Sequence, residues 1–360
     1  MWFRVITFSF ILLTTFSYAQ DFTINDFYSD NPELDAKVEE VFNKLYPGER
    51  VAQLIMPAIG RLGDSDKKID SWVKDKRIGG ILLLNGSKEQ AIAWVEKYNQ
   101  MNKEVGSIPF LYSADAEPSL INRKITGTKV VKSANKMTTK TEVIRAAKSI
   151  SEELNEIGIN YNFAPVIDMS PNKTVGWRGF GQVPDSVIPW SNAFITETQK
   201  HNVIATAKHF PGHGYVVGDT HEQLVHIKGE MKEVKNYPPV IANDVVSIMI
   251  AHIAVEENEK YNTNGLPASV SKEIVTDLLR NDLNFKGLII TDAMNMKGVS
   301  NIKDADIKAI EAGVDILLMP LDAGKAHQAI TEKYIKDAAF KRKVDTACKR
   351  VIRAKLCVAF

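Results

Sequence analysis

The stretch VIATAKHFPGHG, residues 203–214, passes from a short apolar run into a cluster of basic and small residues. A run of small and β-branched residues without polar alternation is typical of a strand that is buried on both faces. Seven further runs have this character, at residues 52–58, 79–84, 109–113, 160–166, 247–251, 287–291 and 315–319. The sequence therefore predicts eight buried strands.

Amphipathic segments separate these runs. Their periodicity predicts helices over residues 89–102, 139–157, 186–201 and 272–283, and a final helix near 344–356. No low-complexity linker divides the chain after its first twenty residues. Eight strands, each followed by a helical or long polar segment, predict an α/β protein that forms a single-domain (β/α)8 TIM-type barrel.

Chemically reactive side chains gather where the predicted strands end. They are Asp115, Asp168, Lys208 with His209, His252 and Asp292, and the opposite ends of the strands carry nothing comparable. In a parallel barrel the C-terminal strand ends meet on one face, where active sites are built. Any one of these residues could be a satisfied polar group of the core, but their convergence predicts a site.

The basic loop that begins at Lys208 has two histidines with a spacing that invites a metal. His209 and His213 are four residues apart, which on a helix would suit zinc. Pro211 and Gly212 lie between them and disfavour a helix. We therefore expect neither a metal site nor a cofactor here.

Asp219 precedes His221 by two residues, so in an extended loop their side chains can meet. The carboxylate would then orient the ring and stabilise its charged form, and such a histidine can donate and later accept a proton. An ordinary exposed loop pair is the alternative. Asp292 could bind a metal, bind a sugar or attack carbon, or it could simply cap a helix. Spacing does not decide between these roles.

Two arginines extend the candidate site. Arg123 lies eight residues beyond Asp115, and Arg178 lies in the segment GWRGFG, residues 176–181. Guanidinium groups near a carboxylate suit the recognition of hydroxyl groups or an amide carbonyl. Surface ion pairing explains either arginine equally well when it is taken alone.

The chain has 360 residues, of which 44% are hydrophobic and 25% are charged, and a formal net charge of +1. This is the composition of a globular protein, and it gives no electrostatic reason to expect a nucleic-acid partner. Cys348 and Cys357 are nine residues apart, or ~13 Å on a helix, which is too far for a disulfide.

Residues 1–19 read as a signal peptide. Arg4 is the only charge before Asp21, residues 5–16 are almost wholly apolar or small, and Ser17 and Ala19 fit a cleavage site. The apolar run is short for a membrane span of ~20 residues, so cleavage is favoured over an uncleaved anchor. We therefore expect an exported protein, periplasmic or secreted, whose mature part is residues 20–360.

Together these segments resemble glycoside hydrolase family 3, in its single-domain β-N-acetylglucosaminidase branch. The shared motifs are NFAPVID (162–168), RGFG (178–181), KHFPGHG (208–214), DTH (219–221), PAS (267–269) and TDA (291–293). The resemblance implies a retaining hydrolase that removes terminal β-linked N-acetylglucosamine from an oligosaccharide without a metal or cofactor. Peptidoglycan fragments are the implied substrate of an exported bacterial copy.

The resemblance also assigns roles. It implies that Asp292 is the nucleophile, that His221 is the general acid/base and that Asp219 is its partner. The sugar contacts that it implies are Asp115, Arg123, Arg178, Lys208 and His209. The sequence departs from the family after Glu117, where Pro118-Ser119-Leu120 replaces the usual glycines, so this loop is expected to be shaped differently.

Two other functions fit the same residues. A histidine acid/base does not repel phosphate as a carboxylate would, which would suit a phosphorylase of the same fold. The altered loop at Pro118 would suit a sugar-binding protein without catalysis.

Overall fold

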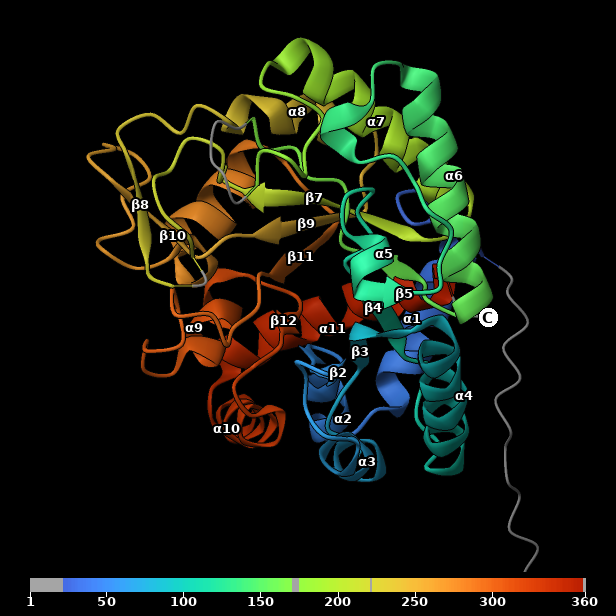
Figure 1. Ribbon diagram of the computed structural model, residues 1–360. Coiled ribbons are helices and arrows are strands. Elements are labelled where there is room, and N and C mark those ends of the chain that lie inside the picture. Colours follow the sequence, from blue (N-terminus) through green and yellow to red (C-terminus); the bar gives the residue numbers. More distant parts are fainter. Residues whose placement is uncertain (1–21, 170–174, 221, 359–360) are drawn as a thin grey trace, which may run out of the picture.

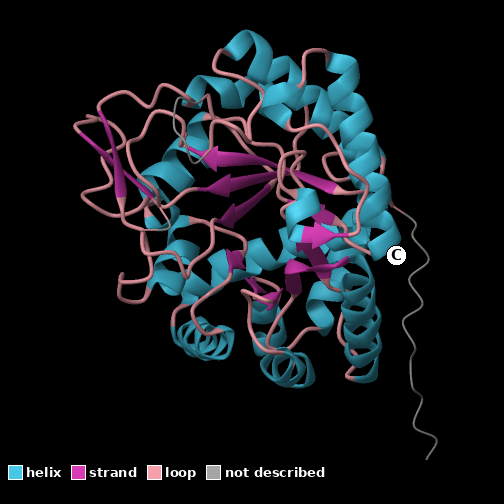
Figure 2. Ribbon diagram, viewed as in Figure 1, coloured by secondary structure: helices cyan, strands magenta, loops and turns pink. Residues whose placement is uncertain are grey.

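The computed structural model describes residues 22–169, 175–220 and 222–358 of the chain (Figure 1). The predicted signal peptide at residues 1–19 and the predicted acid/base His221 lie outside the described residues. Within the described part, the strands of the main sheet occupy the middle of the molecule and helices surround them, while a separate pair of strands lies at its edge (Figure 2). The protein has an α/β fold with a curled parallel sheet.

The sheet is parallel throughout, with strand order β11-β9-β7-β6-β4-β3-β2, and β5 pairs with the end of β3. Two further parallel pairs are β1 with β12 and β8 with β10. The strands are β1 (Ile55–Met56), β2 (Ala58–Gly60), β3 (Gly80–Ser87), β4 (Leu111–Ala114), β5 (Ile125–Thr126), β6 (Tyr161–Asn162), β7 (Ile204–Phe210), β8 (Val225–Lys228), β9 (Ser247–Ile250), β10 (Ile253–Glu256), β11 (Leu288–Thr291) and β12 (Leu317–Leu318).

The edges of the sheet curl toward one another through β12 and β1. Beyond β11, the Thr291 amide donates to the Ile316 carbonyl at 3.1 Å. On the other side of β12, the Leu317 amide donates to the Leu54 carbonyl. Beside β3, the Gly79 amide donates to the Ile55 carbonyl of β1 at 3.0 Å. Main-chain hydrogen bonds therefore continue past both edges of the sheet.

The α-helices are α1 (Pro32–Lys44), α2 (Pro47–Ala52), α3 (Asp66–Lys74), α4 (Lys88–Glu104), α5 (Ile121–Lys124), α6 (Lys140–Ile157), α7 (Pro184–Lys200), α8 (Tyr237–Ile241), α9 (Ala305–Ala312), α10 (Ala323–Lys336) and α11 (Ala338–Val358). Short 3-10 helices are η1 (Ile24–Asp26), η2 (Ala134–Lys136), η3 (Val234–Asn236) and η4 (Ala268–Val270), and η5 (Glu273–Asp282) is π-helical.

Local chemistry explains where these helices begin and end. The Thr139 side chain accepts the Glu142 amide at the start of α6, and Gly158 ends it with φ 91°, a conformation that glycine adopts without strain. Along α6, residues such as Val143, Ile150 and Leu154 form one buried face.

Each of the eight predicted apolar runs contains strand residues, and each predicted helix is present in the described residues. Two expectations need correction. Ala52 belongs to the end of α2, so the first run starts later than expected, and the predicted helix at 272–283 takes the π form. The strands β8 and β10, drawn at the left of Figure 1, were not predicted.

Cys348 and Cys357 are both buried on α11, and neither is in a disulfide. Among the helices that the structure describes, none combines the length and the apolar character needed to cross a membrane.

Candidate active site

Lys208 is the centre of a buried ion-pair cluster at the C-terminal ends of β4 and β7. Its side chain is 1% exposed, and its Nζ lies 2.9 Å from Asp115 Oδ1 and 2.6 Å from Glu117 Oε1. Asp115 and Glu117 follow β4, and Lys208 belongs to β7, so two strand ends supply the cluster. Burial alone would lower the pKa of Lys208, but the two carboxylates raise it above its usual value. Lys208 therefore stays charged.

Arg178 completes the cluster with a bidentate ion pair to Glu117. Its Nε donates to Oε2 at 2.9 Å, and its Nη2 donates to Oε1 at 2.6 Å. This parallel geometry is the strong form of an arginine–carboxylate pair. Burial would raise the pKa of Glu117, but Arg178 and Lys208 hold it below its usual range. Both residues are therefore charged and fixed in place.

Asp115 also contacts a lysine on the next helix. Lys124 Nζ, on α5, lies 3.6 Å from Asp115 Oδ2. Burial opposes ionisation, but Lys208 and Lys124 lower the pKa of Asp115 well below its usual range. The cluster thus holds two carboxylates and three cations.

His209 is held by a carboxylate on the neighbouring strand end. Its Nδ1 lies 2.7 Å from Asp168 Oδ2, and the His213 amide donates to Asp168 Oδ1 at 2.8 Å. Burial would raise the pKa of Asp168, but His209 and His213 lower it. The peptide bond between Lys208 and His209 is cis. Asp168 therefore fixes the His209 ring and the backbone of the following loop together.

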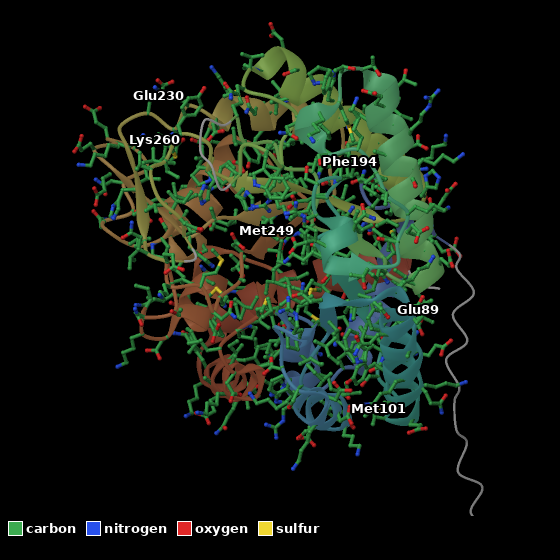
Figure 3. All side chains as sticks on the ribbon, viewed as in Figure 1. Glu89, Met101, Phe194, Glu230, Met249 and Lys260 are labelled. Carbon is green, nitrogen blue, oxygen red and sulfur yellow. The ribbon has the colours of Figure 1, made fainter. Side chains whose placement is uncertain are left out.

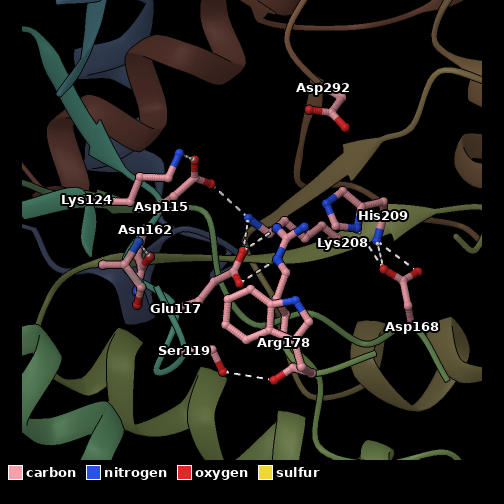
Figure 4. A network of polar contacts seen from close by, with 12 residues as sticks. Asp115, Glu117, Ser119, Lys124, Asn162, Asp168, Arg178, Lys208, His209 and Asp292 are labelled. Atoms are coloured by element: carbon pink, nitrogen blue, oxygen red, sulfur yellow. Dashed lines mark hydrogen bonds and ion pairs between the residues drawn. The ribbon is translucent and has the colours of Figure 1, made fainter. Parts of the chain in front are cut away.

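Asp292 follows β11 and is half-buried. Its amide donates to the Ile250 carbonyl at 2.8 Å, which ties it to the end of β9. In Figure 4 its carboxylate faces the segment that carries Lys208 and His209. The negative charge of Asp292 acts on the pKa of Arg178 and of His213, which places it electrostatically within the same site.

His252 supports the backbone next to Asp292. Its Nε2 lies 3.0 Å from the Ala293 carbonyl, and its Nδ1 lies 2.7 Å from the Ser269 hydroxyl. A ring that donates from Nε2 accepts the serine hydroxyl hydrogen at Nδ1. His252 thus links Ser269 of the PAS motif to the backbone of the residue after Asp292.

The loops after β7 and β11 also meet directly. The Gly298 amide donates to the Thr220 carbonyl at 3.2 Å, and the Thr220 hydroxyl lies 3.3 Å from His213 Nε2. Asp219 is half-buried on the same loop, next to Thr220. The segment that carries Asp219 therefore borders the segment that follows Asp292.

The structure brings together five of the predicted residues, Asp115, Arg178, Lys208, His209 and Asp292 (Figure 4). Among the residues that the structure describes, Arg123 takes no part in the ion pairs of the cluster: its guanidinium lies over the Trp177 ring, 5.2 Å from the ring centroid, and it lines a groove of about 690 Å³ beside β2 and β3. Its neighbour Lys124 contacts Asp115 in the cluster instead.

The departure at Pro118 leaves the cluster intact. Glu117 is fully buried in its ion pairs, and the Ser119 hydroxyl donates to the Trp177 carbonyl at 3.1 Å. The loop leads directly into α5, and the Ile121 amide at the start of this helix donates to the Glu117 carbonyl. Ser119 thus joins this loop to the segment that carries Arg178.

Sequence reasoning did not assign Glu117 or Glu233 to the site. Glu117 stands two residues after Asp115, and that spacing at a strand end is a signal that could have found it. Glu233 has no motif around it, yet it is 3% exposed and accepts the amides of Met169 and Gly214. Burial and the Asp168 carboxylate raise the pKa of Glu233 to about 8.

Across the described ranges, no group of three or more His, Cys, Asp or Glu residues is arranged to hold a metal ion. Ion pairs and hydrogen bonds account for the contacts of the cluster around Lys208.

Several known proteins are similar to this chain in sequence or in structure. Over 196 residues the chain is 34% identical to a protein named beta-hexosaminidase A of Pseudoalteromonas piscicida, a match that spans 49% of this chain and 33% of that relative. A family 3 β-N-acetylglucosaminidase of Paenibacillus superposes with a TM-score of 0.80 at 26% identity, over 88% of this chain and 63% of the other. A β-N-acetylhexosaminidase of Beutenbergia cavernae superposes with a TM-score of 0.76 at 25% identity, over 87% of this chain and 99% of the other.

Residues 48–354 match the family described as the glycosyl hydrolase family 3 N terminal domain. This match covers most of the described residues and includes every strand of the curled sheet. The chain therefore belongs to glycosyl hydrolase family 3.

Proposed function

We propose that the protein is a retaining exo-β-N-acetylglucosaminidase that releases terminal β-linked N-acetylglucosamine from oligosaccharides. The observation that carries this proposal is the placement of Asp292 opposite the buried cluster of Lys208, Arg178 and Glu117. Such a cluster suits a ligand with many hydroxyl groups, because each charged group is fixed before the sugar arrives. The names of the Pseudoalteromonas, Paenibacillus and Beutenbergia proteins support the same activity.

We further propose that the curled sheet closes into a (β/α)8 barrel and that residues 20–360 form one catalytic domain. The hydrogen bonds of Ile316, Leu317 and Gly79 support closure, because they link β11, β12, β1 and β3 in sequence around the sheet. In such barrels the C-terminal strand ends carry the active site.

The binding roles follow from the cluster. Asp115, Lys208 and Arg178 are assigned to sugar hydroxyls and to the amide carbonyl of the acetamido group. Asp168 holds His209 through Nδ1, so Nε2 is assigned to a further hydroxyl. Arg123, stacked on Trp177, is assigned to the outer edge of the sugar.

The reaction proceeds in two steps. The Asp292 carboxylate attacks the anomeric carbon while His221 gives its proton to the departing oxygen, so the glycosidic bond breaks and a glycosyl ester forms. Neutral His221 then takes a proton from water, the water oxygen attacks the same carbon, and Asp292 leaves as a carboxylate. Two inversions retain the configuration. Asp219 orients His221 and stabilises its charged form.

The chain spans only a third of the length of the Pseudoalteromonas relative, so we take the substrate class from the site. A buried, fixed cluster suits one terminal sugar, and we propose peptidoglycan fragments or other amino-sugar glycans as its source. Residues 1–19 are proposed to be removed on export to the periplasm or the medium. Intact mass measurement of the exported protein should show Gln20 as the first residue, and retention of Met1 would reject the cleavage.

The activity is tested with p-nitrophenyl N-acetyl-β-glucosaminide. The wild-type protein should release p-nitrophenol, and Asp292→Asn should release at least a thousandfold less, because an amide is a poor nucleophile. Addition of phosphate should leave free N-acetylglucosamine as the product, whereas sugar-1-phosphate would indicate the phosphorylase. Binding of N-acetylglucosamine without turnover of any β-hexosaminide would identify a sugar-binding protein and reject the hydrolase.

A further inference from the structure

A buried carboxyl group outside the sugar-binding cluster connects two loops of the site. Glu233 lies between β8 and η3 and is 3% exposed. Its Oε2 accepts the Gly214 amide at 2.7 Å, and its Oε1 accepts the Met169 amide. Met169 belongs to the segment that leads from β6 to Arg178, and Gly214 belongs to the loop that leads from β7 to Asp219.

The loop that follows β7 packs directly against this carboxyl group. A Cβ added at Gly212 would lie 2.5 Å from Glu233 Cβ, and one added at Gly214 would lie 2.5 Å from Glu233 Oε1. Real Cβ atoms do not approach so closely. Gly212 also has φ +131°, a conformation that other residues rarely adopt. The two glycines of the KHFPGHG motif therefore leave the space that Glu233 occupies.

Asp168 holds the same loop through a different amide. It accepts the His213 amide at 2.8 Å and binds the His209 ring. The base of the loop is thus held by two buried carboxyl groups that come from different parts of the chain. At its far end the Thr220 carbonyl accepts the Gly298 amide from the loop that follows Asp292.

We propose that Glu233 is a positioning residue for proton transfer, which sets the position of the loop that carries Asp219. It does so through the backbone of Met169 and Gly214, without contact to the sugar. This inference rests on the proposed hydrolase function and adds to it a residue that acts on leaving-group protonation.

Glu233→Gln preserves the shape of the side chain and removes one acceptor. A carboxamide has a single oxygen, so either the Met169 amide or the Gly214 amide then faces an NH₂ group, which cannot accept a hydrogen bond. The loop should move away from this contact. Glu230→Gln is the matched control, because Glu230 is exposed in the same segment and lies at the outer edge of the molecule in Figure 3.

The experiment compares kcat/KM on two substrates with different leaving groups. p-Nitrophenolate is weakly basic and leaves with little protonic help, whereas N,N′-diacetylchitobiose needs a proton on its departing hydroxyl. General acid catalysis is typically worth ~10²–10⁴-fold. Glu233→Gln should therefore lose at least tenfold more kcat/KM on diacetylchitobiose than on the nitrophenyl substrate, and Glu230→Gln should lose neither.

The ratio of the two losses does not depend on how much of the variant is folded, because both substrates meet the same active enzyme. Gly212→Ala places a methyl group against Glu233 and should give the same unequal loss. Equal losses on both substrates in both variants, or no loss, would overturn the inference while leaving the hydrolase in place. A wild-type protein that hydrolyses neither substrate would instead reject the proposed function.

Discussion

Lys208 illustrates how a charged side chain can occupy the interior of the sheet. Removing an ammonium group from water costs several kcal/mol, and only close partners offset that cost. Lys208 has two carboxylates within 2.9 Å, and one of them, Glu117, is also held by Arg178. The arrangement fixes the orientation of each group before a ligand binds.

Lys208→Met should destabilise the fold by about 3–5 kcal/mol, because it leaves Glu117 buried with one cation fewer. Lys124→Met is the control, since Lys124 is 25% exposed and lies 3.6 Å from Asp115, and such a pair is worth roughly 0–1 kcal/mol. Urea unfolding of both variants measures the difference. Equal stabilities of the two variants would show that the Lys208 pairs are not structural.

At the scale of single residues, the sequence indicates which reactive side chains lie at strand ends. It does not indicate which of them contact one another. Strand-end position was enough to select Asp115, Lys208, His209 and Asp292. It could not show that Lys124 rather than Arg123 reaches Asp115, because one residue along α5 turns a side chain by about 100°. Glu233 was missed because its partners, Met169 and Gly214, are far from it in the chain.

At the scale of elements, periodicity found the strands and helices of the sheet but not the pair β8 and β10. Their register pairs Val225 with Ile253, so each strand depends on a partner 28 residues away. In β8 only Val225 is buried, Ile227 is half-buried, and the other two residues are exposed. Such short strands are stabilised by the contact between them, which no local pattern reports.

The helix α11 carries a buried lysine that predicts a pH effect on stability. Lys355 is 3% exposed, and its Nζ donates to Gln53 Oε1 at 2.6 Å. Burial lowers the pKa of Lys355 from 10.5 to about 7. Between these values the unfolded chain binds one proton more than the folded chain, so the free energy of unfolding rises with pH across this window.

Lys355→Met removes this titration. From pH 8 to pH 9.5 the free energy of unfolding of the wild type should therefore rise by up to about 1.4 kcal/mol per pH unit more than that of the variant. Urea titrations at the two pH values measure this difference. Lys349→Met, at a half-exposed position of the same helix, should follow the wild type. If the free energy of unfolding of Lys355→Met changed with pH as much as that of the wild type, the lowered pKa would be contradicted.

At the scale of the whole molecule, one hydrophobic core joins the beginning and the end of the described chain. It extends from Phe22 to Val358 and includes the buried faces of both α1 and α11. A second, much smaller cluster includes residues of β8 and β10. Elements distant in sequence thus share one core, which a (β/α)8 barrel of a single domain would require.

This shared core predicts one cooperative unfolding transition for residues 20–360. Tryptophan fluorescence and far-ultraviolet circular dichroism should give the same urea midpoint, because Trp72, Trp94 and the surrounding helices belong to that core. Two separate transitions would show that part of the chain folds as an independent unit.

The central claim is that Asp292 forms a covalent bond with the sugar during turnover. Incubation with a 5-fluoro derivative of N-acetylglucosaminyl fluoride slows the second step more than the first, so the glycosyl-enzyme accumulates. Peptide mass spectrometry should then show one fluorosugar attached to Asp292 in the wild type and no adduct in Asp292→Asn. An adduct on another carboxylate, or hydrolysis of the probe with no adduct in the wild type, would contradict the account.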